Sequence, residues 1–262
     1  MQCVMGVGIL RDYIVEFDYD TPKVRLYSRD EFTAGRAAAV PLTVRRNTPF
    51  VDVEVQVDDG TLRHAHMVVD TGASYFSLVF VPSFVESAGL LAVTRPARWP
   101  SAGALSPLAA RFKAVTVGPW TIPAQVGALL ESSIGPGMDD GLLGSGFLRQ
   151  FTVAIDFVNA KLYLTPNKRF GAPHAFDASG VAFRRASDGS GYGVAVVLPD
   201  TPAGRADVHV GDRLVRVNGI AAETLTPSEL HDFFTRAGVT LTLELMRGEK
   251  SLTTTLRLEQ RL

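Results

Sequence analysis

The sequence predicts a mainly β protein that folds into two compact units joined by a short linker. Over the first two thirds of the chain, apolar and polar residues alternate in runs bounded by turn residues, as in residues 49–57 before Asp-Asp-Gly. Between residues 167 and 180 the alternation stops, and Pro, Gly and charged residues accumulate. Strand-like runs resume after this stretch, and 262 residues are enough to bury two separate cores.

In the first unit the strongest local signals are hairpins. Each combines two strand-like runs with a turn that contains Gly, Pro, Asp or Asn. They are predicted over residues 49–69, 109–130 and 150–166. A short helix is predicted over residues 83–92, with Gly89 near its end.

The second unit combines short strands with one helix. Thr226 can cap this helix, because Glu229 follows three residues later and completes a capping box, and Pro227 suits the first turn. Strand signals occur over residues 193–198, 213–219, 240–248 and 251–260. The order predicts a small β fold with a helix packed on it.

Composition argues against several classes of function. The net charge is −1 and no Lys- or Arg-rich run occurs, so a nucleic-acid-binding protein is not expected. No stretch has the roughly 18 apolar residues of a transmembrane segment, and the N-terminus lacks the pattern of a secretory signal. Cys3 is the only cysteine, so no disulfide framework is predicted. His64 and His66 share a strand face without suitable carboxylate partners, and we predict no metal and no cofactor.

An internal repeat links the N-terminus to the end of the first unit. Residues 6–26 align without a gap to residues 144–164, and eight of the 21 positions are identical. The identities include the pairs Gly6/Gly144, Gly8/Gly146, Arg11/Arg149 and Asp18/Asp156. Two unrelated hairpins are not expected to share these residues at one offset. We therefore expect residues 1–37 to be the tail of a preceding copy of the first domain, and residues 38–168 to be the domain itself.

One acidic residue marks the end of a predicted strand. Residues 66–78 read HMVVDTGASYFSL, so three apolar residues lead into Asp70 and a glycine breaks the strand two residues later. About seventy residues further on, DGLLGSGFL at 140–148 places two aliphatic residues and a glycine before an apolar turn. Together the two motifs resemble those of the retropepsin and pepsin families of aspartic peptidases. The resemblance covers residues 38–166.

The resemblance implies a retropepsin-like closed β-barrel, the lobe of an acid protease, in which the Asp-Thr-Gly loop lies beneath the hydrophobic-hydrophobic-Gly segment. It makes Asp70, Thr71 and Gly72 the catalytic motif, with Thr71 bonded to a matching loop and Gly72 allowing a close turn. It also implies that Ala73 leaves room for substrate and that Ser74 hydrogen-bonds the outer oxygen of Asp70.

Residues 99–111 lie where retropepsins carry a flap that covers the substrate. Small residues and Gly103 are typical of a mobile lid, and Trp99 would be its aromatic anchor. Trp99 and Gly103 are therefore predicted to contact substrate. A plain surface loop is the alternative.

This type of peptide hydrolysis requires two carboxylates, one to take a proton from water and one to protonate the carbonyl. Two carboxylates about 3 Å apart share one proton, which splits their pKa values. The chain holds no second Asp-Thr-Gly or Asp-Ser-Gly beside the motif at Asp70. An upstream lobe, or a second copy of the chain in a two-fold dimer, would have to supply the partner. The repeat favours the upstream lobe.

Residues 191–221 resemble a PDZ domain of the bacterial type, most specifically in TPAGRADVHVGDRLVRVNG at 201–219. The resemblance implies a domain over residues 180–262 after a linker at 169–179. Such domains add a peptide strand to a sheet edge and hold the peptide C-terminus in a backbone loop. The residues predicted to bind peptide are Gly191, Tyr192, Gly193, Val194, Leu230 and Phe234.

These features predict an aspartic endopeptidase that acts on protein or peptide substrates and uses a PDZ domain to bind substrate or partner peptides. The alternative is a catalytically incomplete peptidase-like scaffold. A serine or metal hydrolase fits less well, because neither Gly-x-Ser-x-Gly nor His-Glu-x-x-His occurs. Relatives with this pair of domains point to the periplasm or the cell envelope.

Overall fold

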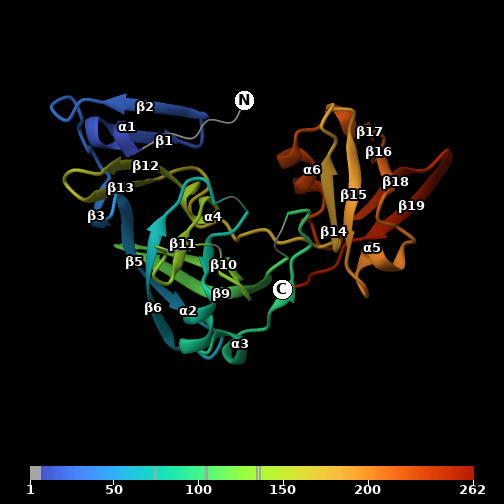
Figure 1. Ribbon diagram of the computed structural model, residues 1–262, viewed down its shortest axis with the longest axis horizontal. Helices are drawn as coiled ribbons and strands as arrows, with labels where there is room; N and C mark the ends of the chain where they lie inside the picture. The colour runs from blue at the N-terminus through green and yellow to red at the C-terminus, as the bar shows by residue number, and fades with distance from the viewer. Residues whose placement is uncertain (1–6, 74, 104–105, 134, 136) are drawn as a thin grey trace. The chain divides into compact units, whose positions relative to one another are not determined.

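The structure is a computed structural model that describes residues 7–73, 75–103, 106–133, 135 and 137–262. Strands dominate it, which confirms the predicted mainly β class (Figure 1). The chain divides into two compact units. The first comprises Met1–Arg95 and Ala110–His174, and the second comprises Pro96–Ala109 and Ala175–Leu262. Residues 96–109, called the inserted segment below, thus group with the second unit, although the sequence analysis places them in domain 38–168.

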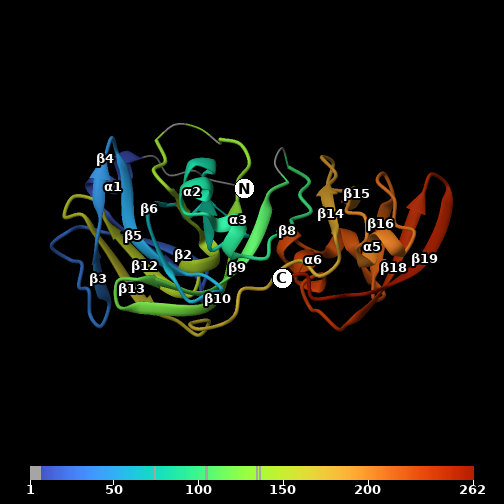
Figure 2. The same ribbon diagram turned by 90° about the horizontal axis from the view of Figure 1, so that it is seen from below.

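Six strands of the first unit close into a barrel. Their order is β5-β6-β11-β7-β10-β9, and β9 pairs back onto β5. Figure 2 views the barrel from below, where β9 and β10 run beside each other. The strands are β5 (Thr48–Gln56), β6 (Leu62–Val69), β7 (Leu78–Phe80), β9 (Leu108–Val117), β10 (Trp120–Leu129) and β11 (Gly141–Leu143), with β4 (Thr43–Arg45) beside β5 and β8 (Ala97–Arg98) beside β9.

The barrel core follows from the alternation in the sequence. In β5, Val51, Val53 and Val55 are buried, whereas Asp52 between them is exposed, because successive side chains point to opposite faces. Large side chains from the other strands fill the interior, among them Met67, Leu78, Phe80, Phe112, Ile122, Leu129 and Leu143. Closure leaves the six barrel strands without an exposed edge.

The helix predicted over 83–92 is instead two short helices, α2 (Pro82–Ser87) and α3 (Leu90–Val93). Gly89 separates them with φ +63°, a left-handed conformation that ends a helix. Among the described residues, no helix is long and apolar enough to cross a lipid bilayer.

The two copies of the repeat pair with each other in a second sheet of the first unit. Its order is β2-β1-β12-β13-β3, and β1 runs antiparallel to β12. Glu16 faces Ala154, its equivalent in the repeat, so the two hairpins are related by a local two-fold axis. The elements are α1 (Val7–Asp12), β1 (Ile14–Asp18), β2 (Lys23–Tyr27), β3 (Ala38–Pro41), α4 (Ser145–Leu148), β12 (Phe151–Asp156) and β13 (Lys161–Pro166).

The likeness of the two hairpins extends to their tips. The Asp18 carboxylate accepts a hydrogen bond from the Thr21 N–H at 3.1 Å, and Asp156 accepts one from the N–H of Asn159, the equivalent of Thr21, at 3.0 Å. The hydroxyl of Thr21 also donates to Asp18 and is the main reason why the pKa of Asp18 falls to about 2. Residues 14–27 therefore form part of a sheet of the first unit.

The second unit is a sheet of order β14-β15-β16-β18-β19, with β17 paired to β16. Thr226 and Glu229 form the predicted capping box at the start of the helix Pro227–Phe233. Tyr192, Val194, Leu214 and Leu243 belong to the core beneath it. The elements are β14 (Val181–Arg185), β15 (Tyr192–Val197), α5 (Pro202–Arg205), β16 (Arg213–Val217), β17 (Ile220–Ala221), η1 (Ala222–Thr224), α6 (Pro227–Phe233), β18 (Thr240–Arg247) and β19 (Lys250–Arg257).

Candidate active site and peptide-binding edge

Asp70 lies directly after β6, where β6 runs parallel to β11 and β11 runs antiparallel to β7. The Asp70 N–H donates to the carbonyl of Leu143 at 3.0 Å, which continues the strand pairing into the loop. The Gly72 N–H then donates to Oδ1 of Asp70 at 2.8 Å. Asp70 is half-buried, so the loop fixes one carboxylate oxygen of a side chain that solvent still reaches.

The segment after β11 packs directly against the loop that holds Asp70. The Ser145 N–H donates to the carbonyl of Ala73 at 2.8 Å, and the Gly146 N–H donates to the carbonyl of Phe76 at 3.0 Å. A Cβ on Gly144 would lie 2.5 Å from the Phe76 oxygen, and one on Gly146 would lie 2.6 Å from the Phe76 carbonyl carbon. Both glycines are therefore needed for backbone-to-backbone contact. The Asp-Thr-Gly and Leu-Leu-Gly motifs meet in space.

The other residues predicted around Asp70 occupy the same turn. Thr71 and Ala73 are half-buried and Gly72 is exposed, while Ser74 lies outside the described residues. The Ala73 N–H donates to the Asp70 carbonyl at 3.4 Å. A bond from Thr71 to a matching loop and contacts of Ala73 with substrate stay predictions.

Tyr19, which the sequence analysis did not single out, lies within electrostatic range of Asp70. Burial raises the pKa of the Tyr19 phenol, the negative charge of Asp70 raises it further, and Arg149 acts in the opposite direction. The Tyr19 hydroxyl is buried and has no hydrogen-bond partner in the described part of the chain. Tyr19 follows β1, so the N-terminal copy of the repeat contributes to the surroundings of Asp70. The one sequence signal is the Tyr19/Phe157 pair in the repeat, where this copy adds a hydroxyl.

A serine and a histidine also meet in the first unit. The Ser77 hydroxyl lies 3.0 Å from Nδ1 of His174, but it donates to Oε1 of Gln125 at 2.6 Å. Gln125 is oriented in turn, because its amide nitrogen donates to the carbonyl of Pro123 at 2.8 Å. Ser77 is fully buried. This geometry is that of a packed polar core, and not that of a serine nucleophile with a histidine base.

The two histidines of β6 lie beside acidic residues without forming a metal centre. Nδ1 of His66 is 2.8 Å from Asp139, which also pairs with Arg45, and His64 is 3.8 Å from Glu54. The hydrogen bonds from His66 and Arg45 lower the pKa of Asp139. Among the described residues, no group of three or more His, Cys, Asp and Glu side chains has a metal-binding arrangement.

The inserted segment is anchored within the second unit. The Trp99 ring is buried and packs edge-on against Phe176, with ring centres 5.1 Å apart, and lies 5.7 Å from the ring of His231. Arg184 donates to the carbonyl of Ala102 at 2.6 Å. The Gly103 N–H donates to the Ser101 hydroxyl at 3.1 Å. Contacts of Trp99 and Gly103 with substrate stay predictions.

Three of the four residues in the predicted peptide-binding loop at 191–194 belong to strand β15. Residues Tyr192, Gly193 and Val194 pair with β14 on one side, and Tyr192 and Gly193 pair with β16 on the other. Val194 also exchanges backbone hydrogen bonds with Asp212 and Gly211. A strand with two neighbours cannot accept a third, so a peptide strand cannot be added at residues 192–194. Contacts of Gly191 with peptide stay a prediction. Leu230 and Phe234 belong to the hydrophobic core, with 3% and 4% of their surfaces exposed.

The sheet of the second unit has two edge strands, β14 and β19, and the edge at β14 is the one beside α6. Within the described residues β14 pairs only with β15, and α6 lies beside it (Figure 1). The ring of Phe183 in β14 packs against that of Phe234 just after α6, at 5.0 Å between centres. This open side of β14 is called the β14 edge below.

Comparisons with known proteins agree with the two units. Residues 53–147 match the family model for an aspartyl protease and residues 178–258 match that for a PDZ domain. No curated protein matches the chain. Among solved structures, the HtrA3 PDZ domain bound to a phage-derived ligand is 28% identical over 33% of this chain and 88% of that chain, with a TM-score of 0.29.

Two further structures have lower sequence identity to the chain. An aminopeptidase N family protein from Idiomarina loihiensis is 21% identical over 34% of this chain and 14% of that chain, with a TM-score of 0.29. A serine endoprotease from Yersinia pestis is 10% identical over 98% of this chain and 99% of that chain, with a TM-score of 0.32. The two family-model matches thus give a region similar to an aspartyl protease, followed along the chain by a region similar to a PDZ domain.

Proposed function

We propose that the protein is an aspartic endopeptidase in which Asp70 is one of two carboxylates that activate water. The observation that carries this proposal is the backbone contact between the Asp70 loop and the glycines at 144 and 146. It holds the carboxylate at a fixed place at the end of a closed barrel, with one oxygen bound to the Gly72 N–H. Fixed positioning of the reacting group is what such catalysis requires.

In this mechanism the two carboxylates share one proton. Oδ1 of Asp70 accepts the Gly72 N–H, which leaves Oδ2 to interact with water and the second carboxylate. The ionised member takes a proton from water as it attacks the peptide carbonyl, and the protonated member donates its proton to the carbonyl oxygen. The pH dependence of the reaction therefore belongs to the pair and not to Asp70 alone.

The two copies of the repeat pair through β1 and β12, and this pairing constrains the source of the second carboxylate. The two hairpins face each other across a local two-fold axis at Glu16 and Ala154. In a symmetric dimer built on this sheet, the β12 edge would have to pair with a second copy, but β1 already occupies it. We propose that an upstream lobe, of which residues 6–26 are the final part, supplies the second carboxylate. A two-fold homodimer is the alternative.

We expect the 262-residue chain to sediment as a monomer or weak dimer and to cleave peptides slowly at acid pH, because it carries one carboxylate motif. Extension by the upstream lobe, with its own Asp-Thr-Gly or Asp-Ser-Gly, should raise the rate about a thousandfold. Analytical ultracentrifugation and an acid-pH assay on a fluorogenic peptide mixture measure both. A tight dimer that cleaves peptide, and loses this on Asp70→Asn, would establish the homodimer instead.

We further propose that the PDZ domain binds peptides by adding a strand at the β14 edge. PDZ domains recognise extended peptides through backbone hydrogen bonds to a sheet edge, and α6 lies beside this one. The bound peptide would be a segment of the substrate or of a partner protein. If Asp70 proved inactive in the extended protein, this binding would remain as the function of a scaffold.

Titration of the ¹⁵N-labelled chain with a mixture of ten-residue peptides should shift the amide signals of residues 181–185 and of α6. We expect micromolar affinity, because one added strand buries little surface. Residues 251–257 of β19, at the opposite edge of the same sheet, serve as an internal control. Shifts confined to β15 or β19, or no shifts at any peptide concentration, would contradict binding at the β14 edge.

A further inference from the structure

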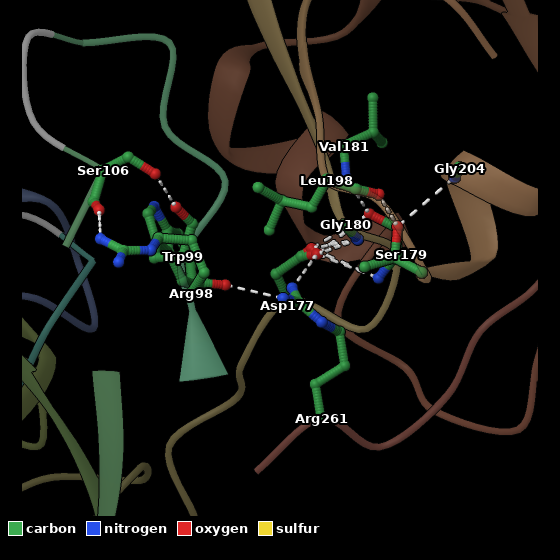
Figure 3. A network of polar contacts seen from close by, with 11 residues as sticks. Arg98, Trp99, Ser106, Asp177, Ser179, Gly180, Val181, Leu198, Gly204 and Arg261 are labelled. Atoms are coloured by element: carbon green, nitrogen blue, oxygen red, sulfur yellow. Dashed lines mark hydrogen bonds and ion pairs between the residues drawn. The ribbon is translucent and has the colours of Figure 1, made fainter. Parts of the chain in front are cut away.

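The loop that leads into β14 already holds a carboxylate. Oδ1 of Asp177 accepts hydrogen bonds from the Ser179 N–H at 2.9 Å and from the Gly180 N–H at 2.7 Å (Figure 3). The Ser179 hydroxyl donates to the same oxygen at 3.0 Å, and the Val181 N–H donates to that hydroxyl at 3.1 Å. Three consecutive backbone N–H groups, the last of them in the first residue of β14, are thus satisfied within the loop, which we call the Asp177 loop (residues 177–181).

The guanidinium of Arg261 links this carboxylate to the inserted segment. Nη1 of Arg261 lies 3.4 Å from Oδ1 of Asp177, and Nη2 donates to the carbonyl of Arg98 at 2.7 Å. The guanidinium also lies over the ring of Phe176, 5.6 Å from its centre. The side chain of Asp177 is only 4% exposed. Burial raises the pKa of Asp177, while the Gly180 N–H and the Arg261 charge act in the opposite direction.

The Asp177 loop is also fixed from behind. Gly180 has φ +79°, and a Cβ there would lie 2.1 Å from the hydroxyl oxygen of Thr201, the residue that caps α5. The Leu198 N–H donates to the Gly180 carbonyl at 2.8 Å. The N–H groups of the Asp177 loop therefore cannot turn toward another acceptor without loss of these contacts.

Peptide C-termini are captured in backbone loops of this kind, in which successive N–H groups surround an anion. Here Asp177 supplies the anion from within the chain. A second carboxylate at the same place would meet a like charge and would have to share the cation Arg261, and two such groups cannot both stay ionised. The place of a terminal carboxylate is therefore taken.

We propose that Asp177 determines the ligand class of the PDZ domain, so that the β14 edge binds internal peptide segments and does not select free C-termini. This rests on the proposed strand addition and replaces the expectation that the domain captures peptide C-termini. Internal segments are also what an endopeptidase would need to recruit from an intact protein chain.

The test compares two forms of each member of a fluorescein-labelled array of ten-residue peptides, one with a free C-terminal carboxylate and one with a C-terminal amide. Fluorescence polarisation with the whole chain should give equal Kd values for the two forms, within about twofold. Asp177→Ala empties the loop and leaves Arg261 without its partner. This variant should bind the carboxylate form about tenfold more tightly than the amide, as a charge-assisted hydrogen bond is worth this much.

The matched control is Asp188→Ala in the same unit. Asp188 accepts a hydrogen bond from the Ser190 N–H at 2.9 Å in a similar turn, but it is exposed. The Asp188→Ala substitution should not change the relative affinity for the carboxylate and amide forms of a peptide. If Asp177→Ala unfolds, Asp177→Asn keeps the size and removes the charge, and it should still favour the carboxylate form, by about threefold.

A wild-type preference of tenfold or more for the free carboxylate over the amide would overturn the proposal. A folded Asp177→Ala protein that gains no preference for the free carboxylate would also overturn it. A preference for the free carboxylate in the Asp188→Ala control would overturn the proposal as well. Binding of neither form by any of these proteins would contradict strand addition itself, and with it the role of Asp177. The difference between the two peptide forms thus isolates Asp177 from the proposed function.

Discussion

Asp70→Asn in the protein extended by the proposed upstream lobe should abolish peptide hydrolysis at acid pH, with kcat lowered about a thousandfold or more and KM little changed. The amide of Asn has the size of the carboxylate and can still accept the Gly72 N–H, which donates to Oδ1 of Asp70 at 2.8 Å. It can neither take a proton from water nor share one with a second carboxylate. The loss is therefore one of chemistry and not of folding.

The matched control is Asp139→Asn, which removes a half-exposed carboxylate from the same unit. Asp139 pairs with Arg45 and His66 and has no part in the proposed mechanism. Its variant should keep full activity, and both variants should unfold at the same urea concentration as the parent. Steady-state kinetics on a fluorogenic peptide between about pH 3 and pH 6 measure the effect on the dyad. Hydrolysis that survives Asn at position 70 would rule out the aspartic mechanism.

The parts of the fold that local chemistry determines were predictable from the sequence. The hairpin over residues 49–69 and the capping box of Thr226 and Glu229 are present in the structure. The helix over 83–92 was predicted as one element because its apolar residues continue past Gly89. The structure divides it there, since the left-handed conformation of Gly89 outweighs the apolar pattern.

The β14 edge was not predictable, because an edge is defined by what lies beside a strand. Gly191–Val194 has the glycines of an anion-binding loop, but long-range pairing with β14 and β16 puts it inside the sheet. The Asp177 loop lay in the stretch taken for a linker. A local signal was present there, since an aspartate two and three residues before Ser179 and Gly180 is typical of a side chain that accepts the following N–H groups.

The two motifs of the candidate site could be recognised in the sequence, but the residues around them could not. The contact of the Asp70 loop with Gly144 and Gly146 follows the spacing expected for the two motifs. Tyr19 was missed because its nearness to Asp70 depends on how β1 pairs with β12. The repeat indicated that the hairpins in residues 6–26 and 144–164 have similar structures. Similarity in sequence does not show that two segments pair with each other.

Gly146→Ala should destabilise the first unit by about 3 kcal/mol, the upper end of what an overpacked methyl group costs. The added Cβ would lie 2.6 Å from the Phe76 carbonyl carbon and from the Ser77 nitrogen, which are backbone atoms. The backbone there cannot retreat freely, because the Gly146 N–H donates to Phe76 and the Gly144 N–H donates to Ser77. The strain therefore falls on the loop that carries Asp70.

Gly8→Ala is the matched control, because Gly8 is the equivalent of Gly146 in the repeat. A Cβ on Gly8 meets nothing within 4 Å, and Gly8 lies in α1, where alanine is favoured over glycine by up to about 1 kcal/mol. The two substitutions should therefore change stability in opposite directions, although they stand at equivalent positions. The chain has two tryptophans, Trp120 in the first unit and Trp99 in the second. In a Trp99→Phe background, the fluorescence of Trp120 therefore measures the urea unfolding of the first unit alone. Equal effects of the two alanines, or a Gly146→Ala protein as stable as its parent, would show that the backbone contact does not hold the Asp70 loop in place.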